Sequence, residues 1–266
     1  MIYYCCEKDW ESVLTCIYEA WTQKRGQANI QLIFEPVVQY TLFDEYIHVK
    51  ADTALAEKVV DAVNRKLSPQ FYYEIAHVGM YEAPDVADVL FRVLLLGFAY
   101  GPHVLEMVQY KDIMRFREMR CSIGNEISHF REFTRFHEVN HRYVAIIEPR
   151  SRIIPALAEV FLDRMPSESW MIADLTNRMA VVHPKDGFYQ FVDLTAEEME
   201  RLMEIEKNND RMEVLWKIFF ETTAIQERKN ERCQKNLYPI WTRKHAVEFM
   251  EMRTEKQTCC ENENVL

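Results

Sequence analysis

Residues 170–192, WMIADLTNRMAVVHPKDGFYQFV, decide the fold. Three apolar runs, Trp170–Asp174, Met179–His183 and Phe188–Val192, are separated by turn-forming residues at Thr176-Asn177 and Pro184-Lys185-Asp186-Gly187. Short apolar runs between turn residues are typical of strands that follow one another in a meander. The stretch therefore predicts an antiparallel sheet in the middle of the chain.

Helical periodicity lies on both sides of this predicted sheet. Apolar residues recur at helical spacing in residues 53–67 and 84–100, and Ser68-Pro69 is a helix-start signal between them. Thr195-x-x-Glu198 is a capping box that starts a helix after the meander. The sequence predicts an α+β fold with a helix-rich N-terminal half, an antiparallel strand meander in the middle, and C-terminal helices packing on it.

The N-terminal part predicts two further strands. Ile2–Cys6 and Tyr46–Lys50 are short apolar or aromatic runs, and residues 26–45 between them show no clear period and predict a loop. The predicted domains are an N-terminal α/β lobe over residues 1–83, a core domain over 84–250 and a disordered tail over 251–266.

Glycine is rare, with six residues among 266, and no two are closer than four positions apart. This spacing excludes the G-x-G-x-x-G turn of dinucleotide-binding proteins, and no G-x-x-x-x-G-K-[ST] phosphate loop is present. Any phosphate recognition must therefore come from arginine, lysine and asparagine side chains.

Charge is distributed unevenly along the chain. The net charge of −10 opposes generic binding to nucleic acid or to anionic membranes. Residues 111–152 carry +3 and residues 211–245 carry +4, which leaves −17 on the rest. These two windows would form a basic surface if they met in space, and two ordinary solvated faces are the alternative.

The cysteines predict free thiols in a reducing cytoplasm. There are seven, with no C-x-x-C spacing and no C-x-x-x-C-x-x-C that would hold a radical-SAM iron–sulfur cluster. We therefore expect no metal and no other cofactor. The longest apolar run, from Val93 to Gly101, is too short to span a bilayer, so we expect a cytoplasmic protein that does not bind membranes. A role for Cys259 and Cys260 does not follow from the sequence.

Residues 129–137, HFREFTRFH, are the first candidate binding segment. Arranged as a strand, the segment would place every second side chain on one face: His129, Arg131, Phe133, Arg135 and His137. Two guanidinium groups beside an aromatic ring suit phosphate contact and base stacking. The alternative is that the rings pack into a core and the arginines pair with neighbouring glutamates. The two histidines have no third metal ligand nearby in the sequence.

Residues 228–245, RKNERCQKNLYPIWTRKH, are the second candidate binding segment. Hydrogen-bond donors and aromatic rings are mixed here, as in surfaces that bind single-stranded nucleic acid or a polar protein partner. The candidate residues are Arg228, Asn230, Gln234, Trp241, Lys244 and His245. A solvated loop with two anchoring rings is the alternative.

Two carboxylates follow predicted strands. Asp174 follows an apolar run, and Glu148 precedes a proline at the end of another run. Each is a candidate acid or base, or a structural partner for an arginine, and the structural role is favoured for Asp174. No H-E-x-x-H motif and no serine elbow is present, so the sequence does not decide whether the chain is an enzyme.

The same regions carry a resemblance to a known family. The sequence resembles a bacterial family of uncharacterised proteins called "probable DNA metabolism protein" over about residues 1–250. The matching motifs include Leu96-Gly97-Phe98-x-x-Gly101, Glu126-x-x-x-Phe130-x-x-Phe133-x-Arg135-Phe136, Ile147-Glu148-Pro149, Trp170-x-Ile172-x-Asp174, Leu215-Trp216-x-x-Phe219-Phe220 and Trp241-x-x-Lys244-His245. A histidine common in the family is Val160 here, and another is Ala173.

The resemblance implies a role beside a radical-SAM protein. Members of the family usually accompany a putative radical-SAM protein of DNA modification or repair, and some are fused to a uracil-DNA-glycosylase-like domain. We therefore expect an accessory protein that binds this partner, nucleic acid or both through residues 129–137 and 228–245. The alternatives are a stand-alone hydrolase or glycosylase-like enzyme that acts on DNA, and a scaffold without nucleic-acid contact.

Overall fold

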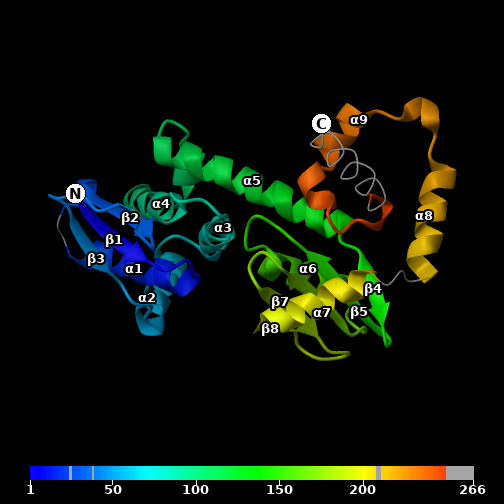
Figure 1. Cartoon of the computed structure of the whole chain (residues 1–266). Coiled ribbons are helices and arrows are strands. Elements are labelled where there is room, and N and C mark those ends of the chain that lie inside the picture. Colours follow the sequence, from blue (N-terminus) through cyan, green and yellow to red (C-terminus); the bar gives the residue numbers. More distant parts are fainter. Residues whose placement is uncertain (24–25, 38, 208–210, 250–266) are drawn as a thin grey trace, which may run out of the picture. The chain divides into compact units, whose positions relative to one another are not determined.

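Two units, each with its own sheet, make up the α+β fold of the computed structural model (Figure 1). The structure describes residues 1–23, 26–37, 39–207 and 211–249. The units are Met1–Gly124 and Asn125–Leu266. The division expected from the sequence near residue 83 remains a prediction about domains, and the predicted tail over 251–266 lies outside the described residues.

The first unit contains a three-stranded parallel sheet in the order β2-β1-β3, with β1 at Ile2–Cys6 and β3 at Glu45–His48. The prediction that residues 26–45 form only a loop is wrong, because Ile30–Phe34 is strand β2. The apolar run at this position is too short to show a period. It becomes a strand because it pairs with β1 residue by residue, from Ile2 opposite Ile30 to Cys6 opposite Phe34.

Helices with local start signals accompany this sheet. Helix α1 is Trp10–Thr22, α2 is Thr53–Lys66, α3 is Pro69–Gly79 and α4 is Val86–Tyr100. The side chains of Asp9, Asp52 and Ser68 each accept a hydrogen bond from a backbone N–H in the first turn of α1, α2 and α3. The starts of α1, α2 and α3 are therefore encoded locally.

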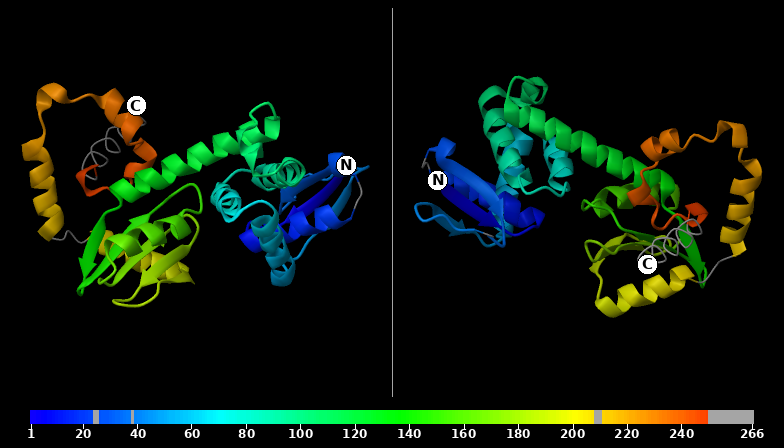
Figure 2. Two further views of the ribbon diagram at one scale, coloured as in Figure 1. Left: turned by 180° about the vertical axis from the view of Figure 1, so that it is seen from behind. Right: turned by 45° about the horizontal axis from the view of Figure 1, so that its top comes forward.

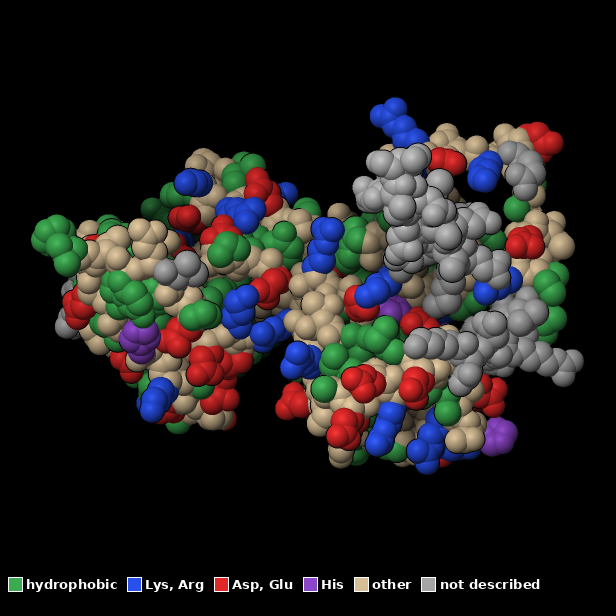
Figure 3. All heavy atoms as spheres, viewed as in Figure 1, with side chains coloured by type: hydrophobic (Ala, Val, Ile, Leu, Met, Phe, Trp, Pro, Cys, Tyr) green, Lys and Arg blue, Asp and Glu red, His purple; other side chains and the backbone are tan. Residues whose placement is uncertain are grey.

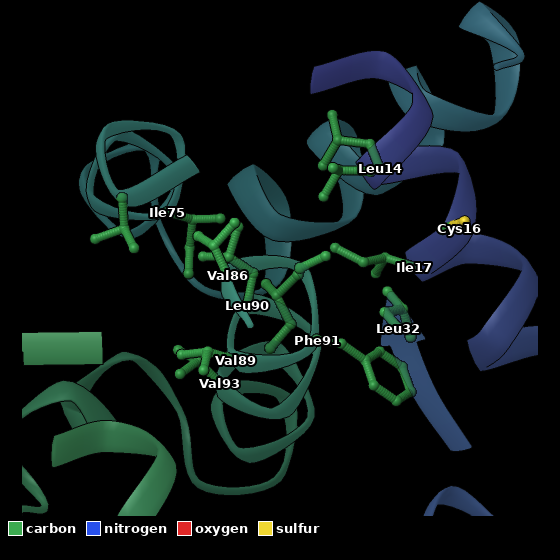
Figure 4. Packing of buried hydrophobic residues seen from close by; sticks show 14 of the residues in the cluster. Leu14, Cys16, Ile17, Leu32, Ile75, Val86, Val89, Leu90, Phe91 and Val93 are labelled. Carbon is green, nitrogen blue, oxygen red and sulfur yellow. The ribbon is translucent and has the colours of Figure 1, made fainter. Parts of the chain in front are cut away.

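The core of the first unit is formed by the inner faces of these helices and β1–β2 (Figure 4). Leu90 and Phe91 of α4 are fully buried there, close to Ile17 of α1 and Leu32 of β2. A Cβ on Gly97 would lie 2.9 Å from the Phe71 ring, so this glycine permits close packing of α4. Gly101 has φ of +85° and follows the last residue of α4. Gly97 thus serves close packing and Gly101 ends the helix.

The described cysteines fall into two groups. Cys5, Cys6 and Cys16 of the first unit are buried, and Cys121 and Cys233 are exposed. Burial raises the pKa of the Cys5 thiol to about 11. A hydrogen bond with Cys6, together with burial, raises the pKa of Cys16 as well. The thiols of Cys5 and Cys16 are therefore poor nucleophiles.

The second unit contains a five-stranded sheet in the order β4-β5-β6-β7-β8. The strands are β4 Phe136–Val139, β5 Arg142–Ile147, β6 Trp170–Asp174, β7 Met179–His183 and β8 Gln190–Asp193. The predicted antiparallel meander is confirmed, since β6, β7 and β8 pair antiparallel in sequence order. The sheet as a whole is mixed, because β5 and β6 are parallel. Helix α6, Ile154–Arg164, makes the crossover that a parallel pair requires.

Helices cover both faces of this sheet (Figure 1). Helix α7, Ala196–Lys207, packs its Leu202 against Val144 and Ile146 of β5 and Ala180 of β7. On the other face, Phe161 of α6 lies beside the rings of Phe136 and Trp170. The predicted capping box is confirmed, since Thr195 N–H donates to Glu198 and Glu198 N–H donates to Thr195 Oγ1.

The strand arrangement considered for residues 129–137 is wrong for residues 129–133. Helix α5 extends over Lys111–Phe133, and only Phe136 onward is strand β4. The helix continues because Phe130 is buried on it, and the chain leaves the helix only at Thr134, whose Oγ1 donates back to the Phe130 carbonyl. A hairpin joins β4 and β5, with Asn140 and His141 in its turn at φ of 50° and 60°.

Helices and short 3₁₀ turns follow α7 in the described part of the second unit. Helix α8 is Arg211–Thr223, α9 is Glu231–Leu237, and short 3₁₀ turns occupy Ile240–Arg243 and Val247–Phe249. The views in Figure 2 show α8 standing apart from the sheet, while the turn at Ile240–Arg243 lies beside the end of α5. Within the described parts of the chain, no helix is long and apolar enough to cross a membrane.

Candidate functional site

The two candidate segments meet in the second unit. The Phe133 and Tyr238 rings stack with their centroids 3.7 Å apart and their planes at 17°. The Phe130 and Trp241 centroids lie 6.0 Å apart. Residues about a hundred positions apart in the sequence are thus joined by aromatic contacts. We call the surface formed by residues 129–137 and 228–245 the joined surface.

Arg135 ties the joined surface to the end of the described chain. Its Nη2 donates to Glu248 Oε1 over 2.7 Å, and its guanidinium carbon lies 5.4 Å from the Trp216 ring centroid. The Glu248 side chain is only 4% exposed, and Trp216 Nε1 also donates to it. The ion-pair partner of Arg135 is a distant buried glutamate, and not one of the neighbouring glutamates that the structural alternative expected.

A small hollow opens on the joined surface. Its volume of about 10 Å³ is room for about one water molecule. It is lined by Phe130, Phe133, Thr134, Arg135, Ile146, Ile147, Glu148, Trp241, Thr242, Lys244 and His245. A nucleobase does not fit into a space of this size, so the hollow is not a base pocket in this conformation.

Charged side chains form a chain of contacts at the edge of the hollow. Lys244 Nζ donates to Glu148 Oε1. His245 lies between two carboxylates, with Nε2 3.2 Å from Glu148 and Nδ1 2.5 Å from Glu206 of α7. His245 therefore connects the end of β5 to helix α7.

The charges around Glu148 favour its ionised form. Burial acts to raise the pKa of this carboxyl, but the ammonium of Lys244 and the ring of His245 outweigh burial, and the net pKa is lowered. At neutral pH Glu148 is therefore an ionised acceptor. It can orient a water molecule or a donor group of a ligand in the hollow.

A buried glutamate fixes the loop that follows Glu148. Glu126 of α5 is 5% exposed, and its Oε1 accepts hydrogen bonds from the backbone N–H groups of Arg150 and Ser151. The Arg150 guanidinium then lies 4.3 Å from the Trp241 ring centroid. Glu126 thus positions the exposed Arg150 guanidinium on the Trp241 indole. Together the two planar groups form a platform of the kind on which nucleobases and peptide groups stack.

Asp174 lies outside the hollow and has a structural environment. Its Oδ1 accepts from the backbone N–H groups of Thr176 and Asn177, and its Oδ2 accepts from Asn177 Nδ2. Burial raises the pKa of this fully buried carboxyl to about 6, and Glu126 adds to the rise while the Asn177 and Thr176 hydrogen bonds oppose it. Its geometry is that of a turn cap.

The remaining candidates occupy separate positions. His129, Arg131 and Phe133 lie on the last turns of α5 and His137 lies buried on β4, so the common strand face predicted for them does not exist. The helix explains this, because positions 129 and 133 share a helical face whereas position 131 points elsewhere.

Exposed Arg131 pairs with adjacent Glu132. Arg228, Asn230 and Gln234 are exposed and do not line the hollow.

Two of these residues have local structural roles. The Asn230 side chain caps α9 by accepting from Cys233 N–H. The Gln234 carbonyl accepts from the guanidinium of Arg243.

Three important residues escape the sequence prediction. Arg243 is 8% exposed, donates to the Tyr238 and Gln234 carbonyls and lies over the Tyr238 and Phe249 rings. Glu206 and Glu248 supply the partners of His245 and Arg135. Arg243 directly precedes the candidates Lys244 and His245 in the second segment, so its position was a signal in the sequence. No local pattern marks either glutamate.

The surface of the second unit mixes both charges (Figure 3). Lysine and arginine side chains alternate with aspartate and glutamate on the face that the figure shows, and no continuous basic stripe is visible there. In the described parts of the chain, no group of three His, Cys, Asp or Glu side chains is arranged to hold a metal ion.

A family model matches residues 84–248, which is more than half of the chain, and it is described as domain of unknown function DUF4130. The chain belongs to the DUF4130 family. The DUF4130 region contains Glu126, both segments of the joined surface and the sheet of the second unit. No curated protein matches the sequence.

Proposed function

We propose that this DUF4130 chain is an accessory protein of a radical-SAM protein in DNA or nucleobase metabolism. It binds this partner, nucleic acid or both through the joined surface. One observation carries the proposal: stacked rings join two segments that are far apart in the sequence into one surface. The sequence resemblance described above supplies the partner and the process.

The dimensions of the joined surface favour binding over enclosure of a substrate. The hollow has room for about one water molecule, so a macromolecule would contact the joined surface from outside. Exposed Arg131 and the Arg150–Trp241 pair supply positive charge and a stacking plane. These groups suit a backbone phosphate and an unpaired base, or the acidic and aromatic groups of a protein.

Co-purification tests the partner. The full chain and its radical-SAM protein, expressed together, are expected to elute as one complex at micromolar concentrations. Separate elution at those concentrations contradicts the proposal, and a complex that Trp241→Ala leaves intact removes the joined surface from the contact.

Oligonucleotide binding tests the nucleic-acid contact. Fluorescence anisotropy with a labelled single-stranded oligonucleotide is measured over a range of salt concentrations. Arg131→Ala and Arg150→Ala are each expected to lower the salt slope by about 1, as the loss of one phosphate contact predicts. Arg201→Ala, on the exposed surface of α7, is the matched control. Arg135→Ala is a poor probe because it leaves the buried Glu248 carboxylate without its guanidinium.

A hydrolase is the second candidate function. It is supported by ionised Glu148, which lies with Lys244 and His245 at a hollow that fits one water molecule. Release of base or nucleotide from single-stranded or uracil-containing DNA, lost in Glu148→Gln, would support this function. Equal background release by wild type and Glu148→Gln counts against it.

A further inference from the structure

Helix α8 presents large apolar side chains to solvent. Leu215, Ile218 and Phe219 are 50%, 51% and 56% exposed, and their spacing of three and four residues places them on one side of the helix. Ile225, just beyond the helix end, is 52% exposed. We call these four residues the apolar stripe.

The other side of α8 holds the helix in place. The Phe220 and Phe249 ring centroids are 6.1 Å apart, and Trp216 Nε1 donates to Glu248. Both contacts lead to the end of the described chain, and Arg135 links them to the joined surface. The helix is thus anchored by one side while the apolar stripe stays open, as the row of hydrophobic side chains along α8 in Figure 3 shows.

An open stripe of this kind is unusual on a solvated helix. A helix that only faces water carries polar residues on its outer side, whereas clustered exposed apolar residues beside polar ones mark an interaction site. Leucine, isoleucine and phenylalanine at this spacing also match the way in which one amphipathic helix packs on another.

The residues after the apolar stripe indicate the charge of the partner. Arg228, Lys229 and Arg232 are exposed, and the acidic Glu227 is the one charged residue between them and Ile225. From Arg228 to Lys235 there are four basic residues and one acidic residue, and this acidic residue, Glu231, is paired with Lys235. Positive charge therefore borders the C-terminal end of the apolar stripe.

We propose that the apolar stripe binds an amphipathic helix of a protein partner. The apolar face of that helix covers Leu215, Ile218 and Phe219, and its acidic residues lie opposite Arg228 and Lys229. The inference rests on the proposed function in one respect, because the partner is the same protein, and it extends that function by adding α8 as a second contact beside the joined surface. An anionic lipid surface would also meet apolar and basic groups, and the experiment separates the two.

The first arm uses model helices and the full chain. A labelled amphipathic helix of leucine and glutamate is expected to bind about tenfold more tightly than its leucine–lysine counterpart, and Phe219→Ser is expected to weaken it about tenfold. Phe188→Ser, at a phenylalanine that is 92% exposed elsewhere in the unit, is the matched control. The double charge reversal Arg228→Glu and Lys229→Glu is expected to invert the preference between the two helices.

The second arm uses the co-expressed radical-SAM protein and separates the two proposals. Loss of co-purification in Phe219→Ser but not in Phe188→Ser supports the inference. Equal co-purification of wild type and Phe219→Ser, with no binding of the leucine–glutamate helix, overturns the inference and leaves the proposed function standing. No co-purification of wild type, with the model helix still bound at the apolar stripe, overturns the proposed function alone.

Two further outcomes contradict the inference. Equal binding of the leucine–lysine helix removes the argument from charge. Tighter binding to phosphatidylglycerol vesicles than to either helix, lost in Phe219→Ser, assigns the apolar stripe to lipid.

Discussion

Asp174 and Glu126 are two buried carboxylates that each hold a loop of the second unit by accepting backbone N–H groups. Asp174 closes a turn between β6 and β7, and burial dominates its ionisation. Glu126 binds two backbone N–H groups of the loop after β5 and so positions Arg150. Neither carboxylate lines the hollow, yet both fix loops at the ends of the strands next to it.

The Asp174 carboxyl makes stability depend on pH. Burial raises its pKa from 3.8 to about 6 in the folded chain. A raised pKa means that the stabilisation is fully present below pH 3.8 and is lost as the pH rises through about 6. Between these pH values, the free energy of unfolding of wild type relative to Asp174→Asn should fall by roughly 2–3 kcal/mol. Urea denaturation at several pH values measures this, with exposed Asp163→Asn as the control. A difference that does not vary with pH contradicts the prediction.

Removal of the Glu126 carboxylate should destabilise the chain. Glu126→Ala leaves the N–H groups of Arg150 and Ser151 without this acceptor, which costs about 2–4 kcal/mol of the free energy of unfolding. Glu126→Gln keeps an acceptor oxygen and should remain within about 1 kcal/mol of wild type. Equal effects of the two variants in chemical denaturation would show that these two hydrogen bonds do not contribute to the free energy of unfolding.

At the scale of elements, Phe133 anchors the C-terminal segment to helix α5. Phe133→Ala removes the ring that stacks on Tyr238, so the amides of residues 234–249 should exchange faster with deuterium. Phe188→Ala, at an exposed phenylalanine, is the matched control and should leave these amides unchanged. Unchanged exchange in Phe133→Ala would mean that Arg243 and Glu248 hold the segment without the ring.

Helix α5 contains a glycine that can be replaced. A Cβ at Gly124 would meet no atom within 4 Å, so Gly124→Ala adds helix propensity without a clash. The expected gain is about 0.5–1 kcal/mol in the free energy of unfolding, measured by urea titration. A loss of stability would indicate that the open space at this position is filled in solution.

The sequence predicts elements well where the signals are local. Caps at Asp9, Ser68 and Thr195 and the turn at Asn140 mark their elements without help from distant residues. Strand β2 and the end of α5 were mispredicted because pairing with β1 and burial of Phe130 decide them. These are tertiary effects that no local pattern contains.

The candidate site follows the same division. Both segments of the joined surface could be recognised by their mixture of rings and basic residues. Their connection could not be recognised, because the paired residues are far apart in the sequence. Arg135 and Glu248 are separated by 113 positions, and His245 and Glu206 by 39. Specific partners at such separations depend on the completed fold rather than on spacing in the sequence.

At the scale of the whole molecule, the net charge of −10 does not indicate where the basic residues lie. Residues from both windows of positive charge occur on the joined surface, but Arg135 and Lys244 are paired with glutamates there. Much of the positive charge thus holds the second unit together, and Arg131, Arg150 and the residues after α8 are the exposed part.

The exposure of the thiols predicts a simple labelling pattern. Iodoacetamide added to the folded chain should modify Cys121 and Cys233 and spare Cys5, Cys6 and Cys16, because the latter are buried and the pKa values of Cys5 and Cys16 are raised. Peptide mass spectrometry reads the result, and rapid modification of Cys16 would contradict it. Unfolding in urea should make all five equally reactive.

The two exposed thiols allow a distance between the units to be measured by spectroscopy. Cys121 belongs to the first unit and Cys233 to the second. Once Cys259 and Cys260 are replaced by serine, a nitroxide on each exposed thiol reports one distance between the units by pulsed electron paramagnetic resonance. The same pair of labels, recorded with and without the radical-SAM protein or an oligonucleotide, turns the arrangement of the two units into a measured distribution.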